Sequence, residues 1–285
     1  MMKGRAGPGA TEGMARMRSR RWLWAVAVAV TLASAVYQRM SGPTYPVRGS
    51  VTLGGESIRL RLARTHPGAG DQPVTVQVPD ASVTGEVAWR RYPTGEAWAT
   101  IPLVRDGDRL TAALPHQPVA GKLEYQLRLR RGDEQAAFPR RPAITRFRND
   151  VPAAVLIPHV FAMFLAMLFS SAAGLSALGR WPQARREAYV CIALLIVGGF
   201  VLGPLMQWFA FGEWWTGVPF GWDLTDNKTL LALSAWLLAA WQMRGGRSAR
   251  TAILFASVAT LIVFAIPHSA WGSEFKWDAP AGTQR

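Results

Sequence analysis

The chain has almost no cysteine, since Cys191 is the only one among its 285 residues. An internal disulfide is therefore excluded, and any exported part must be stabilised by its own hydrophobic core. Cys191 lies inside a long apolar stretch, where a lone cysteine is typical of a small buried side chain. The sequence also has no phosphate-binding loop, no HExxH motif and no Ser-His-Asp spacing. These absences argue against a conventional soluble enzyme and leave enzymatic activity undecided.

Acidic residues are scarce relative to basic ones. The chain has 18 Asp and Glu against 32 Lys and Arg, which gives a formal net charge of +14. Many arginines lie at the ends of apolar stretches: in residues 1–21, at Arg180, Arg185 and Arg186, and at Arg244, Arg247 and Arg250. Basic residues in short loops beside membrane spans mark the cytoplasmic side. The charge is therefore explained by membrane topology, and no nucleic-acid partner is expected.

Long runs without charge are what the sequence has in abundance. They cover residues 22–37, 151–178, 188–211, 229–243 and 251–267. Because about 20 apolar residues in a helix cross a bilayer, the pattern predicts an all-α membrane bundle of four or five spans. The number depends on residues 22–37, which are either a membrane anchor or a signal peptide. Ala33-Ser34-Ala35 is similar to a signal-peptidase site, and cleavage there would leave four spans.

The predicted organisation follows from these runs. Residues 1–21 form a cytoplasmic basic leader, 45–147 an extracytoplasmic domain, and 269–285 an extracytoplasmic tail. Residues 151–268 form a four-helix transmembrane domain whose loop 211–229 faces outward. The predicted location is the inner (cytoplasmic) membrane of a bacterium, with the exported parts in the periplasm. The expected partners are the lipid bilayer and a membrane or periplasmic protein.

Residues 45–147 have a different pattern, with short alternating segments separated by turns. Leu123, Tyr125, Leu127 and Leu129 alternate with polar residues, as a half-buried strand requires. Several such segments predict a β-sandwich inserted into the membrane protein. Leu114-Pro115 followed by Ala120 to Tyr125 resembles fibronectin type III and immunoglobulin-like modules, and the resemblance implies a corner hydrogen bond from the tyrosine. His66 and His116 are expected in loops, either solvated or, less simply, as metal ligands.

The other two histidines follow the same dipeptide, in Ile157-Pro158-His159 and Ile266-Pro267-His268. The first triplet opens one predicted span and the second closes another, so both imidazoles are expected near the outer face. Ionisable groups at membrane depth indicate a functional site. Histidine is the usual axial ligand of b-type haem and a common ligand of zinc or copper. Structural histidines at the bilayer interface are the alternative.

The outer loop has the sequence FGEWWTGVPFGWDLTDNKT, residues 211–229. Tryptophan is common at bilayer interfaces, but the glycines and the proline around Trp214, Trp215 and Trp222 prevent a plain helix. The loop is therefore expected to have a defined backbone at the membrane surface. Thr225 or Asp226 is expected to cap the next helix, which leaves Asp223 to orient a histidine, bind a metal or pair with Lys228.

These features together resemble the tryptophan-rich (WWD-type) haem-handling membrane proteins of cytochrome c biogenesis. The matching positions are Gly212, Trp215, Trp222, Asp223, Lys228 and Thr229 in the loop, with His159 and His268 as the flanking pair. The resemblance implies that the histidines are axial ligands of haem b and that Trp214, Trp215 and Trp222 enclose the macrocycle. It also implies that Asp223 bonds a propionate-side donor or a histidine N–H.

Three functions follow as hypotheses. The first is a membrane protein that binds b-type haem at its outer face for electron transfer or haem handling. The second is a cofactor-free membrane scaffold whose β-sandwich recruits a partner. The third is a divalent-metal site, zinc or copper, whose ligands are His159, His268, Asp223, Asp226 and Glu274.

Overall fold

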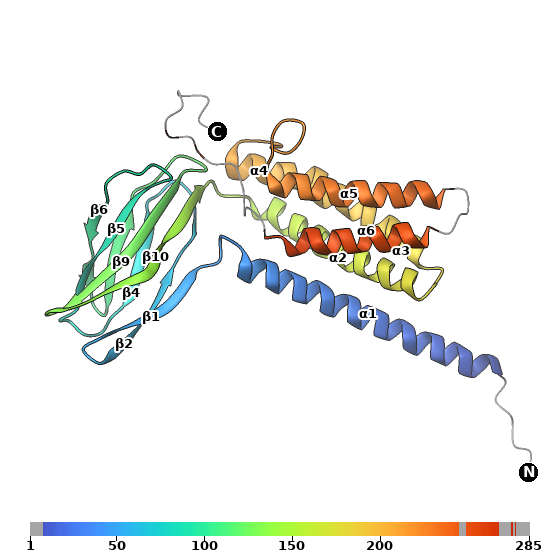
Figure 1. Ribbon diagram of the computed structural model, residues 1–285, viewed down its shortest axis with the longest axis horizontal. Helices are drawn as coiled ribbons and strands as arrows, with labels where there is room; N and C mark the ends of the chain where they lie inside the picture. The colour runs from blue at the N-terminus through green and yellow to red at the C-terminus, as the bar shows by residue number, and fades with distance from the viewer. Residues whose placement is uncertain (1–7, 245–248, 268–274, 276, 278–285) are drawn as a thin grey trace, which may run out of the picture. The chain divides into compact units, whose positions relative to one another are not determined.

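The apolar stretches of the chain fold into helices and the alternating stretches fold into strands (Figure 1). The computed structural model describes residues 8–244, 249–267, 275 and 277, with side chains from residue 21 onward. Contacts divide these residues into two units. The helical unit consists of residues 8–40, 153–206 and 215–267, and the β unit of residues 41–152, 207–214, 275 and 277.

Helices account for nearly all of the helical unit. Their bounds are α1 (Pro8–Ser41), α2 (Ala153–Leu178), α3 (Ala184–Leu195), the π-helical segment η1 (Ile196–Leu202), α4 (Gly203–Phe211), α5 (Leu224–Met243) and α6 (Arg250–Ala265). Helix α3, η1 and α4 follow one another without a break. Helices α2, α3, α5 and α6 run side by side in Figure 1.

Small side chains line the contacts between these helices. The fully buried alanines Ala166, Ala188, Ala239 and Ala256 come from α2, α3, α5 and α6 respectively. Small residues let helix backbones approach closely, which is how apolar helices gain packing energy in a lipid environment. Helix α1 packs separately on α2, where Ala27 lies against the buried Ala172.

The prediction of four or five membrane spans is wrong. Among the described residues, three helices are long and apolar enough to cross a membrane: Arg21–Ser41, Ala153–Leu178 and Ala184–Phe211. The predicted span 229–243 lies in α5, whose first turns are polar, so its apolar part is short. The predicted span 251–267 corresponds to α6, which has 16 residues. At 1.5 Å per residue such a helix is about 24 Å long, less than the roughly 30 Å of a hydrocarbon core.

The described residues of the β unit form ten strands in three sheets, and not the two packed sheets of the predicted β-sandwich. Their bounds are β1 (Val47–Leu53), β2 (Glu56–Leu62), β3 (Thr65–Pro67), β4 (Gln72–Gln77), β5 (Thr84–Tyr92), β6 (Ala99–Pro102), β7 (Val104–Asp106), β8 (Arg109–Leu114), β9 (Lys122–Arg131) and β10 (Glu134–Arg148). They make a five-stranded sheet in the order β3-β10-β9-β5-β6, a three-stranded sheet β4-β8-β7 and the hairpin β1-β2. The β3–β10 pair is parallel and all the other pairs are antiparallel.

The three sheets share one hydrophobic core. Leu123, Tyr125, Leu127 and Leu129 of β9 are all buried and the residues between them are not, which confirms the predicted alternation. The same alternation holds in β4, where Val74 and Val76 are buried. Burying every second residue of several strands on one side is what lets the sheets stack on a common core.

A buried polar network lies within this core. The Tyr125 hydroxyl donates to the carbonyl oxygen of Ala63 at 2.6 Å and accepts from Nε2 of Gln72 at 3.4 Å. Thr145 Oγ1 donates to Gln72 Oε1 at 2.6 Å, so β4, β9 and β10 are joined by side-chain hydrogen bonds. Burial raises the pKa of Tyr125, since the charged form would lose its hydration. The Tyr125 hydroxyl therefore bonds a carbonyl 62 residues upstream, whereas the expected corner bond would reach the backbone a few residues upstream.

Candidate functional site

His159, in the first turns of α2, is held by a backbone carbonyl. Its Nδ1 lies 2.9 Å from the carbonyl oxygen of Gly198 in η1, and the imidazole is half-buried. A carbonyl oxygen can only accept, so Nδ1 carries the hydrogen and the neutral ring keeps its lone pair on Nε2. A ring N–H bonded to a carbonyl is the usual support of metal-ligating histidines. His159 therefore has the tautomer that an Nε2 ligand requires.

The π-helical turn that presents Gly198 has a cause in the sequence. Pro204 comes just after η1. It has no N–H, and in a regular α-helix its ring would clash with the carbonyl of Phe200, four residues earlier. A wider turn relieves that clash, and such π turns are frequent at functional sites. The turn falls in the middle of the third candidate span, beside the start of α2.

Two glycines let η1 approach its neighbours. A Cβ on Gly198 would lie 2.8 Å from Sδ of Met163 on α2, closer than side chains tolerate. A Cβ on Gly199 would lie 2.6 Å from Cγ2 of Thr229 on α5. The glycines thus allow η1 to fit between α2 and α5 of the same chain. This close fit brings the Gly198 carbonyl within reach of His159.

The loop of residues 212–223 is fastened to the first turn of α5 by side chains of that turn. Oδ2 of the buried Asp226 accepts hydrogen bonds from the N–H and the hydroxyl of Thr216, at 2.7 and 3.2 Å. Oδ1 of Asn227 accepts from the N–H of Val218 at 2.7 Å. A charged acceptor bonded to a backbone N–H is stronger than a neutral one. The loop therefore has a defined backbone, and Asp226 has a structural role in it.

Asp223 is the N-cap of α5. Its Oδ1 accepts from the N–H groups of Thr225 and Asp226, at 2.7 and 3.4 Å. The expectation that Thr225 or Asp226 is the cap is wrong, because the helix begins at Leu224 and both residues lie inside it. A carboxylate at this position satisfies free N–H groups and interacts favourably with the helix dipole. Two of the three carboxylates proposed as metal ligands, Asp223 and Asp226, thus already bond to the backbone.

Trp215 is the loop tryptophan that packs on the segment bonded to His159. Its ring stacks on Phe200 of η1, with centroids 5.5 Å apart and an interplanar angle of 28°. Its Nε1–H donates to the carbonyl of Val218 at 3.1 Å. Stacking and hydrogen bonding together fix the orientation of the indole. Trp215 therefore forms an aromatic wall with Phe200.

The other two predicted tryptophans have different surroundings. Trp214 belongs to the β unit and stacks on Trp208, with centroids 5.0 Å apart. Trp222 is 87% exposed and Phe220, nearby in the loop, is 82% exposed. The three tryptophans expected to enclose one ligand are thus in three settings: packed on η1, stacked in the β unit, and exposed on the loop.

Lys228 joins the start of α5 to the end of α6. The side chain is buried, and Nζ donates to the carbonyl oxygen of Ile266 at 2.5 Å. Nε2 of Gln38 donates to the carbonyl of Phe264 at 2.8 Å and, more weakly, to that of Ile266 at 3.4 Å. A buried ammonium is stable only when it is hydrogen-bonded, so this contact fixes the chain two residues before His268. His268 and Glu274 themselves lie outside the described residues.

These contacts bring four segments of the helical unit to one place. His159 of α2 bonds to η1, η1 packs on Thr229 of α5, and the neighbouring Lys228 bonds to the end of α6. The loop covers the start of α5, and its Trp215 returns to η1. We call this arrangement the α2–η1–α5 site. It consists of one half-buried imidazole, a fixed indole and a buried lysine.

At the α2–η1–α5 site, the histidine nitrogen of the protein is more available to a ligand than the carboxylates of the protein are. No group of three or more His, Cys, Asp or Glu suited to a metal ion occurs in the described part of the chain. Asp223 and Asp226 are occupied by backbone N–H groups, whereas Nε2 of His159 keeps its lone pair. An imidazole nitrogen of this kind can ligate a haem iron, zinc or copper.

The two histidines of the β unit lie together. Nε2 of His66 and Nδ1 of His116 are 2.9 and 3.1 Å from the same carbonyl oxygen, that of Gly70. Both rings also meet Phe147 edge-on, with centroids 5.4 and 5.6 Å away. Each histidine thus bonds to the backbone. His116 is an exposed residue between β8 and β9, as expected of a loop histidine, whereas His66 is half-buried and lies in β3.

Several residues of the α2–η1–α5 site carried no sequence signal of their own role. Phe200 is an ordinary member of an apolar run, and the Gly198 carbonyl is a backbone group. Thr229 was matched as a loop position, and its contact with η1 was not expected. The one usable signal is Gly198-Gly199 followed by Gly203-Pro204, a combination that indicates close packing and a disturbed helix.

The chain matches no protein-family model and no curated protein.

Replacing Trp215 by alanine is expected to loosen the loop, and replacing Trp222 is not. The first substitution removes the stacking on Phe200 and one hydrogen bond, worth about 1–3 kcal/mol together. The second removes a ring that is mostly exposed. Hydrogen–deuterium exchange of residues 212–223 in the full-length protein measures the difference. Equal exchange in the two variants would show that the aromatic wall does not hold the loop.

Proposed function

We propose that this protein binds haem b at the α2–η1–α5 site and acts in electron transfer or haem handling. The observation that carries the proposal is the bond from His159 Nδ1 to the Gly198 carbonyl, which leaves Nε2 as a ligand. When bound, haem would supply a one-electron redox centre. The residues of the chain would bind it, orient it and control its access to water.

His268 would be the second histidine to hold the haem. Support comes from the residues before it, since Lys228 holds the Ile266 carbonyl and thereby ties the end of α6 to the start of α5. The same start of α5 packs on η1 through Thr229. Lys228, which anchors Ile266, is thus next in sequence to Thr229, which contacts η1. The same segment η1 bonds His159.

The aromatic residues of the loop are proposed to shield the macrocycle. Trp215 and Phe200 offer a fixed apolar wall next to η1. Trp222 is exposed and lies directly before the helix cap Asp223, so it is available to stack on a bound ligand. Trp214 keeps this role only as a proposal from the resemblance, since its contact in the structure is with Trp208.

The proposed location is the outer leaflet side of a bacterial cytoplasmic membrane. Arg180 lies in the turn between α2 and α3, and Arg185 and Arg186 lie in the first turn of α3, at the opposite end of α2 from His159. Arginines in such short connections favour the cytoplasmic side. Since α2 has the length of a full span, its first turn would then face outward.

A zinc or copper ion is the second candidate ligand of the α2–η1–α5 site. The Nε2 lone pair of His159 suits these metals as well as it suits haem iron. Asp223 and Asp226 would have to give up hydrogen bonds to backbone N–H groups to join it. That cost makes haem the better-supported ligand.

The test is an absorption spectrum of the full-length protein, expressed with haem supply and purified in detergent, together with elemental analysis. A Soret band with about one iron per chain is the expected result. Stoichiometric zinc or copper without a Soret band would favour the second candidate. A protein with neither haem nor metal would overturn both and leave the cofactor-free scaffold.

A further inference from the structure

We infer that the basic end of the helical unit binds the phosphate group of an anionic phospholipid, with one acyl chain lying along α3. Two adjoining depressions carry this inference. The first, of about 450 Å³, lies between the α2–α3 turn and the start of α6, and the second, of about 570 Å³, lies on α3. They share Pro182 and Arg185, so they form one continuous surface. This surface is separate from the α2–η1–α5 site, at the other end of α2.

The first depression has the charge of a phosphate site. Arg180, Arg185 and Arg250 line it together with Trp181. Arg250 is held in place, because its Nε and Nη2 donate to the carbonyls of Ala177 and Leu178 at 3.0 and 3.2 Å. Within the described residues, no carboxylate forms an ion pair with these arginines. Their charge is therefore available to an anionic ligand.

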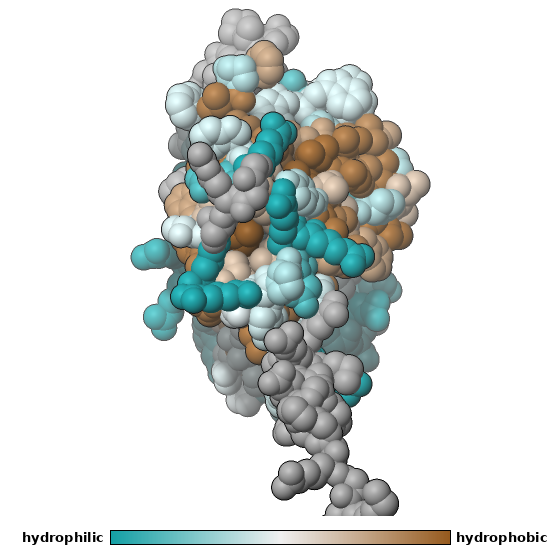
Figure 2. Space-filling model, turned by 90° about the vertical axis from the view of Figure 1, so that its right-hand side faces the viewer, coloured by the Kyte–Doolittle hydropathy of each residue, from teal (hydrophilic) through white to brown (hydrophobic). Residues whose placement is uncertain are grey.

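Figure 2 views this end of the helical unit, and long hydrophilic side chains surround a less polar centre there. The nearest acid along the chain is Glu187, which is buried in α3. Trp181 is half-buried beside the arginines, in the position where tryptophan meets lipid headgroups. Basic pockets between helices at this depth recognise anionic headgroups.

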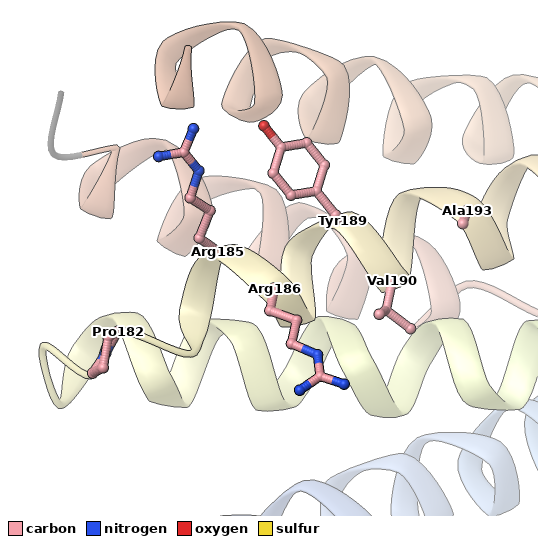
Figure 3. A pocket seen from close by; sticks show the side chains of 6 residues that line it. All are labelled: Pro182, Arg185, Arg186, Tyr189, Val190 and Ala193. Carbon is pink, nitrogen blue, oxygen red and sulfur yellow. The ribbon is translucent and has the colours of Figure 1, made fainter. Parts of the chain in front are cut away.

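The second depression supplies the apolar part. Figure 3 shows Arg185 and Tyr189 projecting from one side of α3, Arg186 and Val190 from another, and Ala193 further along the helix. Charged groups thus stand at one end of the depression and apolar side chains lead away from them. Because α3 belongs to a candidate span, the apolar end runs into the depth of the bilayer. A free phosphate would use the arginines alone, whereas a phospholipid uses both parts.

The test is binding of dioctanoyl-phosphatidylglycerol to the full-length protein in detergent, counted by native mass spectrometry. Dioctanoyl-phosphatidylcholine, which has no net charge, is the matched lipid. Each arginine near an anionic surface contributes about fivefold in affinity. Arg185→Gln is therefore expected to weaken the binding of dioctanoyl-phosphatidylglycerol by about fivefold. The double variant Arg180→Gln with Arg185→Gln is expected to weaken it by about 25-fold. Arg185→Lys keeps the charge and should keep most of the binding.

The control is Arg59→Gln, which replaces an exposed arginine of β2. This variant should bind phosphatidylglycerol as the wild type does. Equal binding of the two lipids by the wild-type protein would overturn the inference, and so would wild-type affinity in the double variant. Displacement of the lipid by millimolar inorganic phosphate would also overturn it, because the occupant would then be free phosphate. If a glutamine variant does not fold, the comparison of the two lipids on the wild type and on Arg185→Lys decides.

Discussion

Replacing His159 by alanine is expected to abolish the Soret band of the haem-loaded protein, or to convert it to the spectrum of a five-coordinate iron. Among the described residues of the α2–η1–α5 site, His159 supplies the only imidazole, and Asp223 and Asp226 bond to backbone N–H groups. Alanine keeps the helix, since it has the best helix propensity. The absorption spectrum and the iron content per chain measure the effect.

The matched control is His116→Ala in the β unit, where the imidazole bonds to the carbonyl oxygen of Gly70. It should leave the spectrum unchanged. His159→Gly leaves space for a free imidazole, so adding imidazole is expected to restore a six-coordinate spectrum. A His159→Ala protein with the wild-type spectrum and wild-type helix content would show that the haem is bound elsewhere.

The local patterns of the sequence predicted local structure well. Alternation over residues 123–129 predicted β9 and its buried face, because a strand repeats every two residues and one face must leave water. The apolar run 151–178 predicted α2 nearly to the residue. In both cases the pattern comes from one physical requirement on residues close in sequence. The strand must remove one face from water, and the long apolar helix must remove its whole surface from water.

The number of spans could not be predicted in the same way. The runs 229–243 and 251–267 are apolar, but length decides whether a helix crosses a bilayer, and length depends on where the helix begins. Helix α5 begins five residues before the apolar run, with Asp223 as its cap. Helix α6 ends at Ala265, directly before Ile266 and Pro267. Helix ends depend on hydrogen bonds that hydropathy does not report.

The positions of some candidate residues could be predicted from the sequence, but their contacts could not. The position of His159 at the start of α2 was clear, whereas its partner is a carbonyl 39 residues away on a π turn. The carboxylates Asp223 and Asp226 looked like ligands because acids beside tryptophans are unusual. In the structure Asp226 accepts a hydrogen bond from a backbone N–H of the loop, and Asp223 accepts one from a backbone N–H of α5. Polar residues that hold an irregular loop have the same composition as polar residues that hold a ligand.

Replacing Trp236 by alanine is expected to have the largest effect on stability. Trp236 lies in α5 and is completely buried, and its Nε1–H donates to Thr260 Oγ1 on α6 at 2.8 Å. Truncation would leave a cavity between the two helices and remove their side-chain hydrogen bond. Loss of a fully buried tryptophan costs about 3–5 kcal/mol. For a chain of this size that corresponds to a fall in Tm of roughly 10 °C.

The same helix offers the matched control. Trp241 is five residues further along α5 and 67% exposed, so Trp241→Ala removes little buried surface and should change the free energy of unfolding by about 0.5 kcal/mol or less. Thermal unfolding of both full-length variants in the same detergent measures the difference. Since α5 also carries the cap and the loop anchors, Trp236→Ala is expected to increase hydrogen exchange in residues 212–223 as well. Similar melting temperatures for the two variants would show that the stability of α5 does not depend on its packing against α6. The hydrogen bond from Lys228 to Ile266 would then be the side-chain hydrogen bond left to join the two helices in the described part of the chain.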